Sequence, residues 1–346
     1  MRVTNGDAKE LWKPQKQPLI SVVVPTLGKD LDLLGRCLDS LRRQTLTDFE
    51  VIVVYPGNGE RLLDLCRVYE AIPVEETGKS LGAARNSGVE RARGSLVAFI
   101  DDDCEAPQTW LERICATFQQ HPSVSCLGGP DLMPREGKRS VFAVSVGAFD
   151  ESRRTRLALD RSAVNKIKGA NVTCKKEVFE RIRYNTSLQY GEDLEFHIRL
   201  IENGCHLRFD PEVWLWHRQN PGRGGLLHGL SHMLRCSISS APIFASWKTL
   251  TYAKDDSLIA SFYLSLFLLP VMVVLLCASS LGFCLVLSSL MVTYTAFTVW
   301  TTKISNISTI CSIPFLVALT TLTRLLGFCV GTVAHIFKQY GRIHLA

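Results

Sequence analysis

Three consecutive carboxylates, Asp101, Asp102 and Asp103, directly follow an apolar stretch at 96–100 that is typical of a buried strand. Adjacent negative charges repel one another, so the triplet is costly at a strand end unless a cation lies among them. Carboxylate oxygens bind Mg²⁺ or Mn²⁺, and such ions often bind substrate phosphates as well. The triplet therefore predicts a divalent-metal and phosphate site, although a solvated acidic loop or a helix cap would contain the same residues.

A second acidic group, Glu192 and Asp193, precedes a helix-like segment at 194–204. A carboxylate here could act as a general base, or it could cap the helix by accepting its first N–H groups. The pattern alone leaves both interpretations open.

Two basic residues lie in stretches that could bind a ligand. Small residues at 80–88 would allow close approach to the backbone, and Arg85 among them could bind a phosphate or a nucleotide base. His217 ends the aromatic run at 214–217 and could be a metal ligand or an ordinary core residue.

The elements that would position these residues alternate between strand and helix. Strands are predicted at 19–24, 49–54, 71–74, 96–100 and 124–127, and helices at 31–44, 80–92 and 109–119. This alternation predicts a parallel sheet with helices on both faces. Ligands bind such sheets beyond the carboxyl ends of the strands, where the acidic triplet lies.

Taken together, these motifs resemble glycosyltransferase family 2, the inverting enzymes with the GT-A fold. The resemblance covers about residues 18–220 and follows the order of the family's motifs. It is carried by VVVPT at 22–26, GAARNSG at 82–88, FIDDDC at 99–104, KGANV at 168–172, GEDLEF at 191–196 and WLWH at 214–217. The resemblance implies an α/β fold of the nucleotide-diphospho-sugar transferase type, with a Rossmann-like mixed sheet.

The resemblance also implies roles for the matched residues. Asp101 and Asp103 would serve the nucleotide-sugar and its Mg²⁺ or Mn²⁺, with Asp102 between them on the donor side. Asp193 matches the catalytic base, and Glu192 would orient it or touch the acceptor. The other matches are a metal-ligand position at His217, nucleotide-lining positions at Pro25, Thr26 and Arg85, and a sugar and acceptor region at Gly169, Ala170, Asn171, Trp214 and Trp216.

One position departs from the family pattern. Tyr55 stands after the second predicted strand, where such enzymes usually carry an aspartate that contacts the nucleotide base. Tyr55 could stack on the base or only fill space, so the identity of the base stays open.

The C-terminal part has the composition of a membrane domain. All 33 acidic residues lie at or before Asp256, and the run from 257 to 302 contains no charged residue and no His. At about 1.5 Å per residue this run is long enough for two crossings of a hydrocarbon core about 30 Å thick. We expect transmembrane segments at about 258–278, 281–300 and 307–337. Arg324 interrupts the third, which could instead be partly interfacial.

These patterns predict the following organisation of the chain. A polar N-terminal extension covers 1–17, the catalytic domain 18–220, amphipathic juxtamembrane helices 221–256, the transmembrane segments 257–337 and a C-terminal tail 338–346. The apolar and basic residues of 221–256 would suit a membrane surface, or an ordinary helix packed on the catalytic domain. The fold class is therefore a GT-A α/β domain followed by an α-helical membrane domain.

The cysteines and the N-terminal residues indicate the cellular compartment of the catalytic domain. Twelve cysteines are dispersed without any C-x-x-C pair, which is typical of reduced thiols in the cytosol. The chain is polar through Gln17, and its first apolar run is too short for a signal peptide. We expect a multi-pass integral membrane protein whose catalytic domain faces the cytoplasm.

The predicted function is transfer of a sugar from a nucleotide-sugar to a hydroxyl of a lipid-linked or other membrane-associated glycan acceptor. Membrane lipids are further partners, whereas nucleic acid is not expected, because all but four of the 39 basic residues share residues 1–256 with the 33 acidic ones. A base at Asp193 favours a hydroxyl acceptor, since a phosphate acceptor is already ionised. The alternatives are a polyprenyl- or dolichol-phosphate sugar synthase and a catalytically inactive membrane-anchored binding protein.

Overall fold

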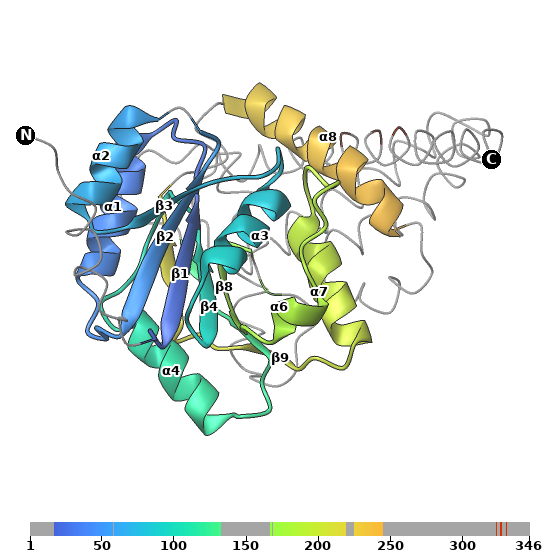
Figure 1. The fold of residues 1–346 in the computed structure, drawn as a ribbon. Coiled ribbons are helices and arrows are strands. Elements are labelled where there is room, and N and C mark those ends of the chain that lie inside the picture. The colour runs from blue at the N-terminus through green and yellow to red at the C-terminus, as the bar shows by residue number, and fades with distance from the viewer. Residues whose placement is uncertain are drawn as a thin grey trace, which may run out of the picture.

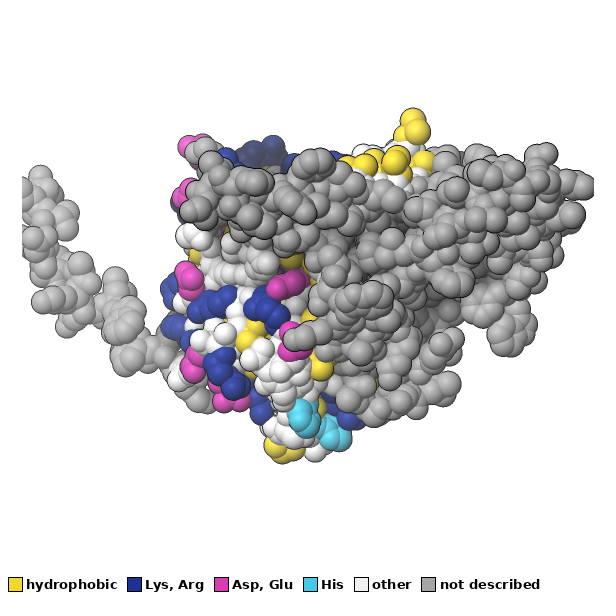
Figure 2. Space-filling view, turned by 90° about the vertical axis from the view of Figure 1, so that its right-hand side faces the viewer, with side chains coloured by type: hydrophobic (Ala, Val, Ile, Leu, Met, Phe, Trp, Pro, Cys, Tyr) yellow, Lys and Arg dark blue, Asp and Glu magenta, His cyan; other side chains and the backbone are white. Residues whose placement is uncertain are grey.

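The computed structural model describes residues 17–57, 59–132, 167, 169–218 and 225–244, together with Thr323, Leu326 and Val330. These residues form a seven-stranded sheet in the order β3-β2-β1-β4-β8-β6-β9, with helices on both faces (Figure 1). On the face shown in Figure 2, basic and acidic side chains are interspersed.

The first half of the sheet is parallel, as the alternating pattern predicts. All six residues of β1 (Ile20–Pro25) are buried, as its run of β-branched residues suggests. β1 lies between β2 (Phe49–Tyr55) and β4 (Leu96–Ile100), and β3 (Ile72–Glu75) extends the sheet beyond β2. The carboxyl ends of these strands therefore meet at one edge.

The second half makes the sheet mixed. β8 (Asn171–Lys175) runs antiparallel to both β4 and β6 (Cys126–Gly128), and β9 (Leu207–Phe209) runs parallel to β6. Because β8 is reversed, its first residue pairs with Ile100 at the end of β4. The residues just before β8 are thereby brought next to the acidic triplet.

A second, three-stranded sheet lies beside this edge. Its strands are β5 (Cys104–Glu105), β10 (Leu215–His217) and β7 (Asp131–Leu132), in the order β5-β10-β7. β10 pairs antiparallel with β5 and parallel with β7. This small sheet joins three segments that are far apart in sequence.

Helices cover each face of the large sheet with a separate apolar cluster. α1 (Leu31–Arg42), α2 (Glu60–Val68) and α4 (Trp110–Gln120) pack on one face. α3 (Leu81–Arg91), the short α6 (Val178–Arg181) and α7 (Glu192–Glu202) pack on the other. The helices predicted at 31–44, 80–92 and 109–119 end within two residues of their predicted ends, whereas α2 was not predicted.

One expectation about the cysteines is wrong. Cys126 on β6 and Cys174 on β8 form a disulfide, so the twelve cysteines are not all reduced. The two residues lie directly opposite each other in the β6–β8 register, with Cα atoms 4.1 Å apart. Because the two cysteines are 48 residues apart, the sequence pattern did not indicate that they pair.

The region at 221–256 contains helix α8 (Gly225–Phe244), which lies on the side of α3 and α7 in Figure 1. Its Ser239 side chain is hydrogen-bonded to the backbone of Tyr190, just before α7. No helix within the described residues is both long and apolar enough to cross a membrane. The predicted segments at 258–278, 281–300 and 307–337 lie outside the described residues, apart from Thr323, Leu326 and Val330.

Candidate active site

The acidic triplet lies where β1 and β4 end together. The β1–β4 register pairs Val23 with Phe99, so Thr26 lies opposite Asp102 three residues further on. The Thr26 hydroxyl donates a hydrogen bond to the Asp102 carboxylate. Burial raises the pKa of Asp102 to about 6, with Asp103 and Asp101 adding to the effect and Thr26 opposing it. Thr26 and Asp102, both predicted on the donor side, are thus in direct contact.

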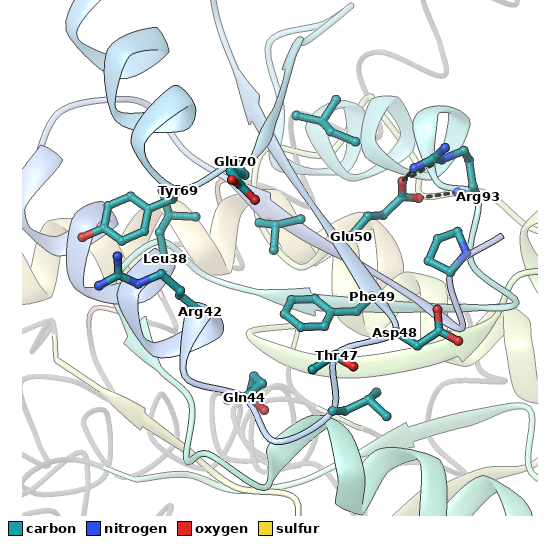
Figure 3. A pocket seen from close by; sticks show the side chains of 14 residues that line it. Leu38, Arg42, Gln44, Thr47, Asp48, Phe49, Glu50, Tyr69, Glu70 and Arg93 are labelled. Atoms are coloured by element: carbon teal, nitrogen blue, oxygen red, sulfur yellow. Dashed lines mark hydrogen bonds and ion pairs between the residues drawn. The ribbon is translucent and has the colours of Figure 1, made fainter. Parts of the chain in front are cut away.

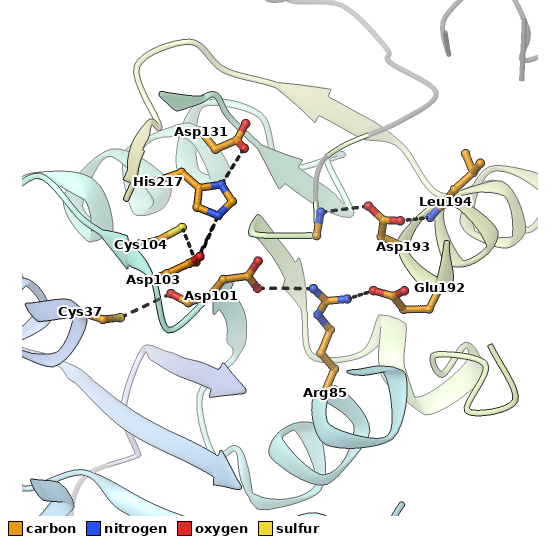
Figure 4. Close-up of polar contacts among 11 residues, drawn as sticks. Cys37, Arg85, Asp101, Asp103, Cys104, Asp131, Glu192, Asp193, Leu194 and His217 are labelled. Carbon is orange, nitrogen blue, oxygen red and sulfur yellow. Dashed lines mark hydrogen bonds and ion pairs between the residues drawn. The ribbon is translucent and has the colours of Figure 1, made fainter. Parts of the chain in front are cut away.

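The third carboxylate of the triplet faces the small sheet. His217 Nε2 lies 3.2 Å from the Asp103 carboxylate, and His217 Nδ1 lies 3.3 Å from Asp131 Oδ2 (Figure 4). Burial lowers the pKa of His217, but the hydrogen bonds and charges of Asp103 and Asp131 outweigh it and raise that pKa to about 10. The negative potential at this point therefore attracts positive charge.

The donor atoms at this point fit a divalent cation. Ligand atoms of Asp103, Cys104 and His217 lie within 4.8 Å of one another, and Asp101 adds a carboxylate at the same strand end. Carboxylate oxygens suit Mg²⁺ and Mn²⁺, and an imidazole nitrogen is a common ligand of transition-metal ions. The structure thus brings the three residues predicted to hold metal, Asp101, Asp103 and His217, to one edge.

Arg85 is buried between two carboxylates. Its side chain is 2% exposed. Nη1 donates to Glu192 Oε1 at 2.6 Å, and Nη2 lies 3.7 Å from Asp101 Oδ1 (Figure 4). Its guanidinium also lies over the Tyr184 ring, 5.3 Å from the centroid. The structure therefore places Arg85, which the resemblance puts on the nucleotide, between the acidic triplet and the Glu-Asp pair.

Glu192 and Asp193 stand in the first turn of α7. The N-cap is Gly191, with φ of 79°, so Asp193 is not the helix cap. Asp193 Oδ1 accepts the N–H of Leu194 at 2.8 Å, and its Oδ2 accepts the N–H of Gly169 at 3.3 Å. Each carboxylate oxygen has a second lone pair with which it can accept a further hydrogen bond. Burial raises the pKa of Glu192 even though Arg85 opposes this shift.

The residues just before β8 and its first residue have different surroundings. A Cβ atom on Gly169 would lie 2.7 Å from Arg85 Nη2, so glycine allows the guanidinium to pack against the backbone here. The neighbouring Ala170 is buried. Asn171 is buried, and its side chain donates to the carbonyls of Pro130 and Val213 and accepts from Trp110 Nε1. Its amide is thus directed into the protein interior.

The aromatic residues predicted at the site lie on or beside β10 and at the end of β2. The rings of Trp214 and Trp216 are nearly perpendicular, with centroids 5.0 Å apart, and both side chains are partly exposed. Tyr55 ends β2 and packs partly buried against the core, and Pro25 ends β1.

Two residues at the site were not predicted from the sequence. Asp131 contacts His217 from β7, and Tyr184 packs beneath Arg85. Neither residue belongs to any of the motifs identified in the sequence. Strand pairing brings Asp131 to its partner 86 residues away.

A cavity of about 790 Å³ lies elsewhere, at the amino ends of β1 and β2 (Figure 3). Its described lining includes Arg42 beside Tyr69, and Glu50 paired with Arg93, but none of the residues predicted from the sequence. The candidate site lies at the opposite ends of these parallel strands.

The sequence model of Glycosyl transferase family 2 matches residues 21–179, a span that includes the acidic triplet. Residues 21–179 are thus similar to glycosyl transferase family 2 domains. In this region the chain resembles proteins described as glycosyltransferases. The match ends before Glu192, Asp193 and His217. The fold places these three residues next to the acidic triplet, which lies within the match (Figure 4).

Proteins described as glycosyltransferases resemble part of this chain. The uncharacterized glycosyltransferase EpsJ of Bacillus subtilis is 23% identical over 221 residues, covering 59% of this chain and 62% of its own length. Glycosyltransferase AglE of Haloferax volcanii is 26% identical over 215 residues, covering 59% of this chain and 68% of its own length. This chain spans slightly less than two thirds of the length of EpsJ and slightly more than two thirds of that of AglE.

A solved structure shows the same fold. The mannosyltransferase PcManGT of Pyrobaculum calidifontis, in complex with GDP-Man and Mn²⁺, superposes with a TM-score of 0.61 at 18% identity, covering 91% of each chain. The chain therefore has a GT-A-like α/β fold with a mixed sheet, as the sequence predicted.

Proposed function

We propose that this protein is an inverting glycosyltransferase that moves a sugar from a nucleotide-sugar to a hydroxyl of a membrane-associated, lipid-linked acceptor. One observation carries the proposal: the acidic triplet and the Glu-Asp pair lie at one site, bridged by Arg85. Arg85 is 2.6 Å from Glu192 and 3.7 Å from Asp101. For transfer to occur, the residues that bind the donor and the residue that acts as base must lie close together.

The donor side of the site is built from the ends of β1 and β4. Thr26 and Asp102 would contact the nucleoside, and Asp101, Asp103 and His217 would hold Mg²⁺ or Mn²⁺. When bound, the ion neutralises charge on the diphosphate and on the leaving nucleoside diphosphate. PcManGT, which shares the fold, was solved with GDP-Man and Mn²⁺, and this supports a nucleotide-sugar donor and a divalent ion here.

The acceptor side is formed by Asp193 and its neighbours. Two backbone N–H groups hold its carboxylate in one orientation. Asp193 would take the proton of the acceptor hydroxyl as that oxygen bonds to the anomeric carbon and the bond to the diphosphate breaks on the opposite face. Glu192, held by Arg85, would keep the first turn of α7 in place.

The acceptor class rests on the C-terminal composition. An uncharged apolar run from 257 to 302 would hold the catalytic domain at a bilayer, on the cytoplasmic face, and raise its effective concentration towards a lipid-borne substrate. Co-sedimentation of the full chain with membranes after an alkaline carbonate wash would support this location, and release into the supernatant would contradict it.

The donor side is tested by calorimetry of the detergent-purified full chain with a panel of nucleotide-sugars, with and without Mn²⁺. We expect one donor to bind in a Mn²⁺-dependent way and Asp103→Ala to abolish that dependence. Glu105→Gln is the matched control, because it removes a nearby carboxylate that pairs with Arg218. Metal-independent binding by the wild type, or unaltered binding by Asp103→Ala, would contradict the proposal.

A further inference from the structure

Asp131 has a contact that no motif explains. Its carboxylate is buried, and its Oδ2 lies 3.3 Å from His217 Nδ1, on the far side of the ring from Asp103. Nε2 of the same ring lies 3.2 Å from Asp103. The three side chains thus form a line from β7 through β10 to the end of the acidic triplet (Figure 4).

The small sheet holds this line in place. β7 and β10 pair in register, with Asp131 beside Leu215, and His217 pairs with Cys104 on β5. Backbone hydrogen bonds fasten both ends of β10: Leu215 N–H donates to Pro130 at 2.9 Å, and Arg218 N–H donates to Asp103 at 2.9 Å. The backbone at His217 is therefore held in place between the two carboxylates, and the ring contacts both of them.

The chemistry of imidazole gives this arrangement a consequence. A neutral imidazole carries its proton on one nitrogen and can bind a metal only through the other. A carboxylate that accepts from Nδ1–H keeps the proton there and leaves the Nε2 lone pair available. Without that acceptor, the proton can reside on Nε2, and the ring can rotate.

We propose that Asp131 is a positioning residue of the metal site, which fixes the orientation and tautomer of His217 so that Nε2 is directed to an ion shared with Asp103. This inference rests on the metal site in the proposed function. Asp131 itself need not touch the ion, so its effect is exerted through His217. Outer carboxylates of this kind commonly change metal affinity by about 10–100-fold.

The experiment measures Mn²⁺ affinity of the full chain in detergent by isothermal titration calorimetry, without donor. We expect Asp131→Ala to weaken Mn²⁺ binding by about 10–100-fold. Glu105→Gln, which removes a carboxylate of the same small sheet that pairs with Arg218, should leave the affinity near that of the wild type. Asp131→Asn keeps the shape and an oxygen acceptor, so its affinity should lie between those of the wild type and His217→Ala.

A double-mutant cycle separates a role through His217 from a general charge effect. In a His217→Ala background, Asp131→Ala should cause little further loss, because the residue through which it acts is gone. Electron spin-echo envelope modulation of bound Mn²⁺ should show an imidazole nitrogen coupling in the wild type that weakens in Asp131→Ala and Asp131→Asn. A purely structural role would leave this coupling unchanged in a folded variant.

The outcomes are distinguishable. If the wild type binds no Mn²⁺, the metal site of the proposed function is wrong and this inference fails with it. If the wild type binds Mn²⁺ but both Asp131 variants bind it equally well, or if the two mutations have additive effects, only the role of Asp131 is overturned. Should Asp131→Ala fail to fold, the Asp131→Asn affinity and nitrogen coupling decide the question.

Discussion

The Arg85 guanidinium connects two groups of carboxylates that are separate in the sequence. It is almost completely buried, pairs with Glu192 and lies close to Asp101 and the Tyr184 ring. Removing one partner of a buried ion pair leaves an uncompensated charge, which typically costs about 3–5 kcal/mol. Arg85 therefore stabilises the relative position of the donor side and the acceptor side of the site.

At the scale of single residues, Asp193→Asn should separate binding from chemistry. The amide keeps the shape of the side chain but is a far weaker base, so we expect sugar transfer to fall by about 10²–10⁴-fold with donor binding unchanged. Glu195→Gln is the matched control, because Glu195 is in the same first turn but pairs with Arg199. Radiolabelled sugar transfer and calorimetry measure the two effects, and full transfer by Asp193→Asn would remove Asp193 from the role of base.

At the scale of elements, α3 packs closely on β1 at Gly88. A Cβ atom at Gly88 would lie 2.3 Å from Val23 Cγ1, whereas a Cβ at Gly35 in α1 would meet Leu65 at an ordinary 3.9 Å. Alanine favours a helix over glycine by about 1 kcal/mol. At Gly88 the clash should outweigh this gain, because overpacking typically costs about 1–3 kcal/mol.

We therefore expect Gly88→Ala to lower the thermal unfolding midpoint and Gly35→Ala to leave it unchanged or raise it. Circular dichroism melts of the two variants make the comparison directly. Equal midpoints would show that α3 can shift away from β1 without cost.

Helix α8 contacts the segment that leads into α7. The Ser239 hydroxyl accepts the N–H of Tyr190 at 3.1 Å and donates to its carbonyl at 3.0 Å, one residue before the left-handed Gly191. Both polar backbone groups of Tyr190 are thus held by one side chain. This contact links the region expected at the membrane surface to the turn that presents Glu192 and Asp193.

Ser239→Ala should release that turn. A small displacement of a catalytic group can reduce turnover by up to about 100-fold, so we expect kcat to fall while KM for the donor changes little. Ser231→Ala, on an exposed part of the same helix, is the control and should behave as wild type. A parallel rise in donor KM would instead point to an effect on the donor side.

At the scale of the whole molecule, a charged cluster joins elements at the amino edge of the sheet. Glu50 on β2 accepts from Ser21 on β1 and pairs with Arg93 before β4 at 2.7 Å. Burial alone would raise the pKa of Glu50, but the hydrogen bonds from Ser21 and Arg93 lower it below its usual value. Its stabilising effect is therefore present above the unfolded pKa of about 4.3 and is lost as the pH falls through the lower folded value.

Glu50→Gln should destabilise the protein at pH 7 by about 1–3 kcal/mol, the range for hydrogen bonds to a charged group. The difference from wild type should shrink below about pH 4.3 and vanish at more acidic pH, where Glu50 is protonated in both states. Denaturant unfolding at a series of pH values measures this difference. A difference that does not depend on pH would mean that the Glu50 charge makes no contribution.

The sequence by itself determined the parallel half of the fold and much of the site. The apolar runs at β1, β2 and β4 and the helix faces at α1, α3 and α4 depend on local periodicity, which a sequence displays directly. The acidic triplet was placed at the ligand edge for the same reason, because it directly follows a buried strand. The pattern also marked Asp193 and His217, whose roles the resemblance then suggested, and the structure brings both to that edge.

Only the tertiary structure decided which side chains meet. The reversal of β8 brings Gly169 to Asp193 and pairs Cys126 with Cys174, while it turns Asn171 into the interior. The small sheet brings Asp131 to His217, and the crossing of α3 buries Arg85 between Asp101 and Glu192. These contacts depend on strand order and register, which are set by packing across the whole molecule and not by the periodicity of any one segment.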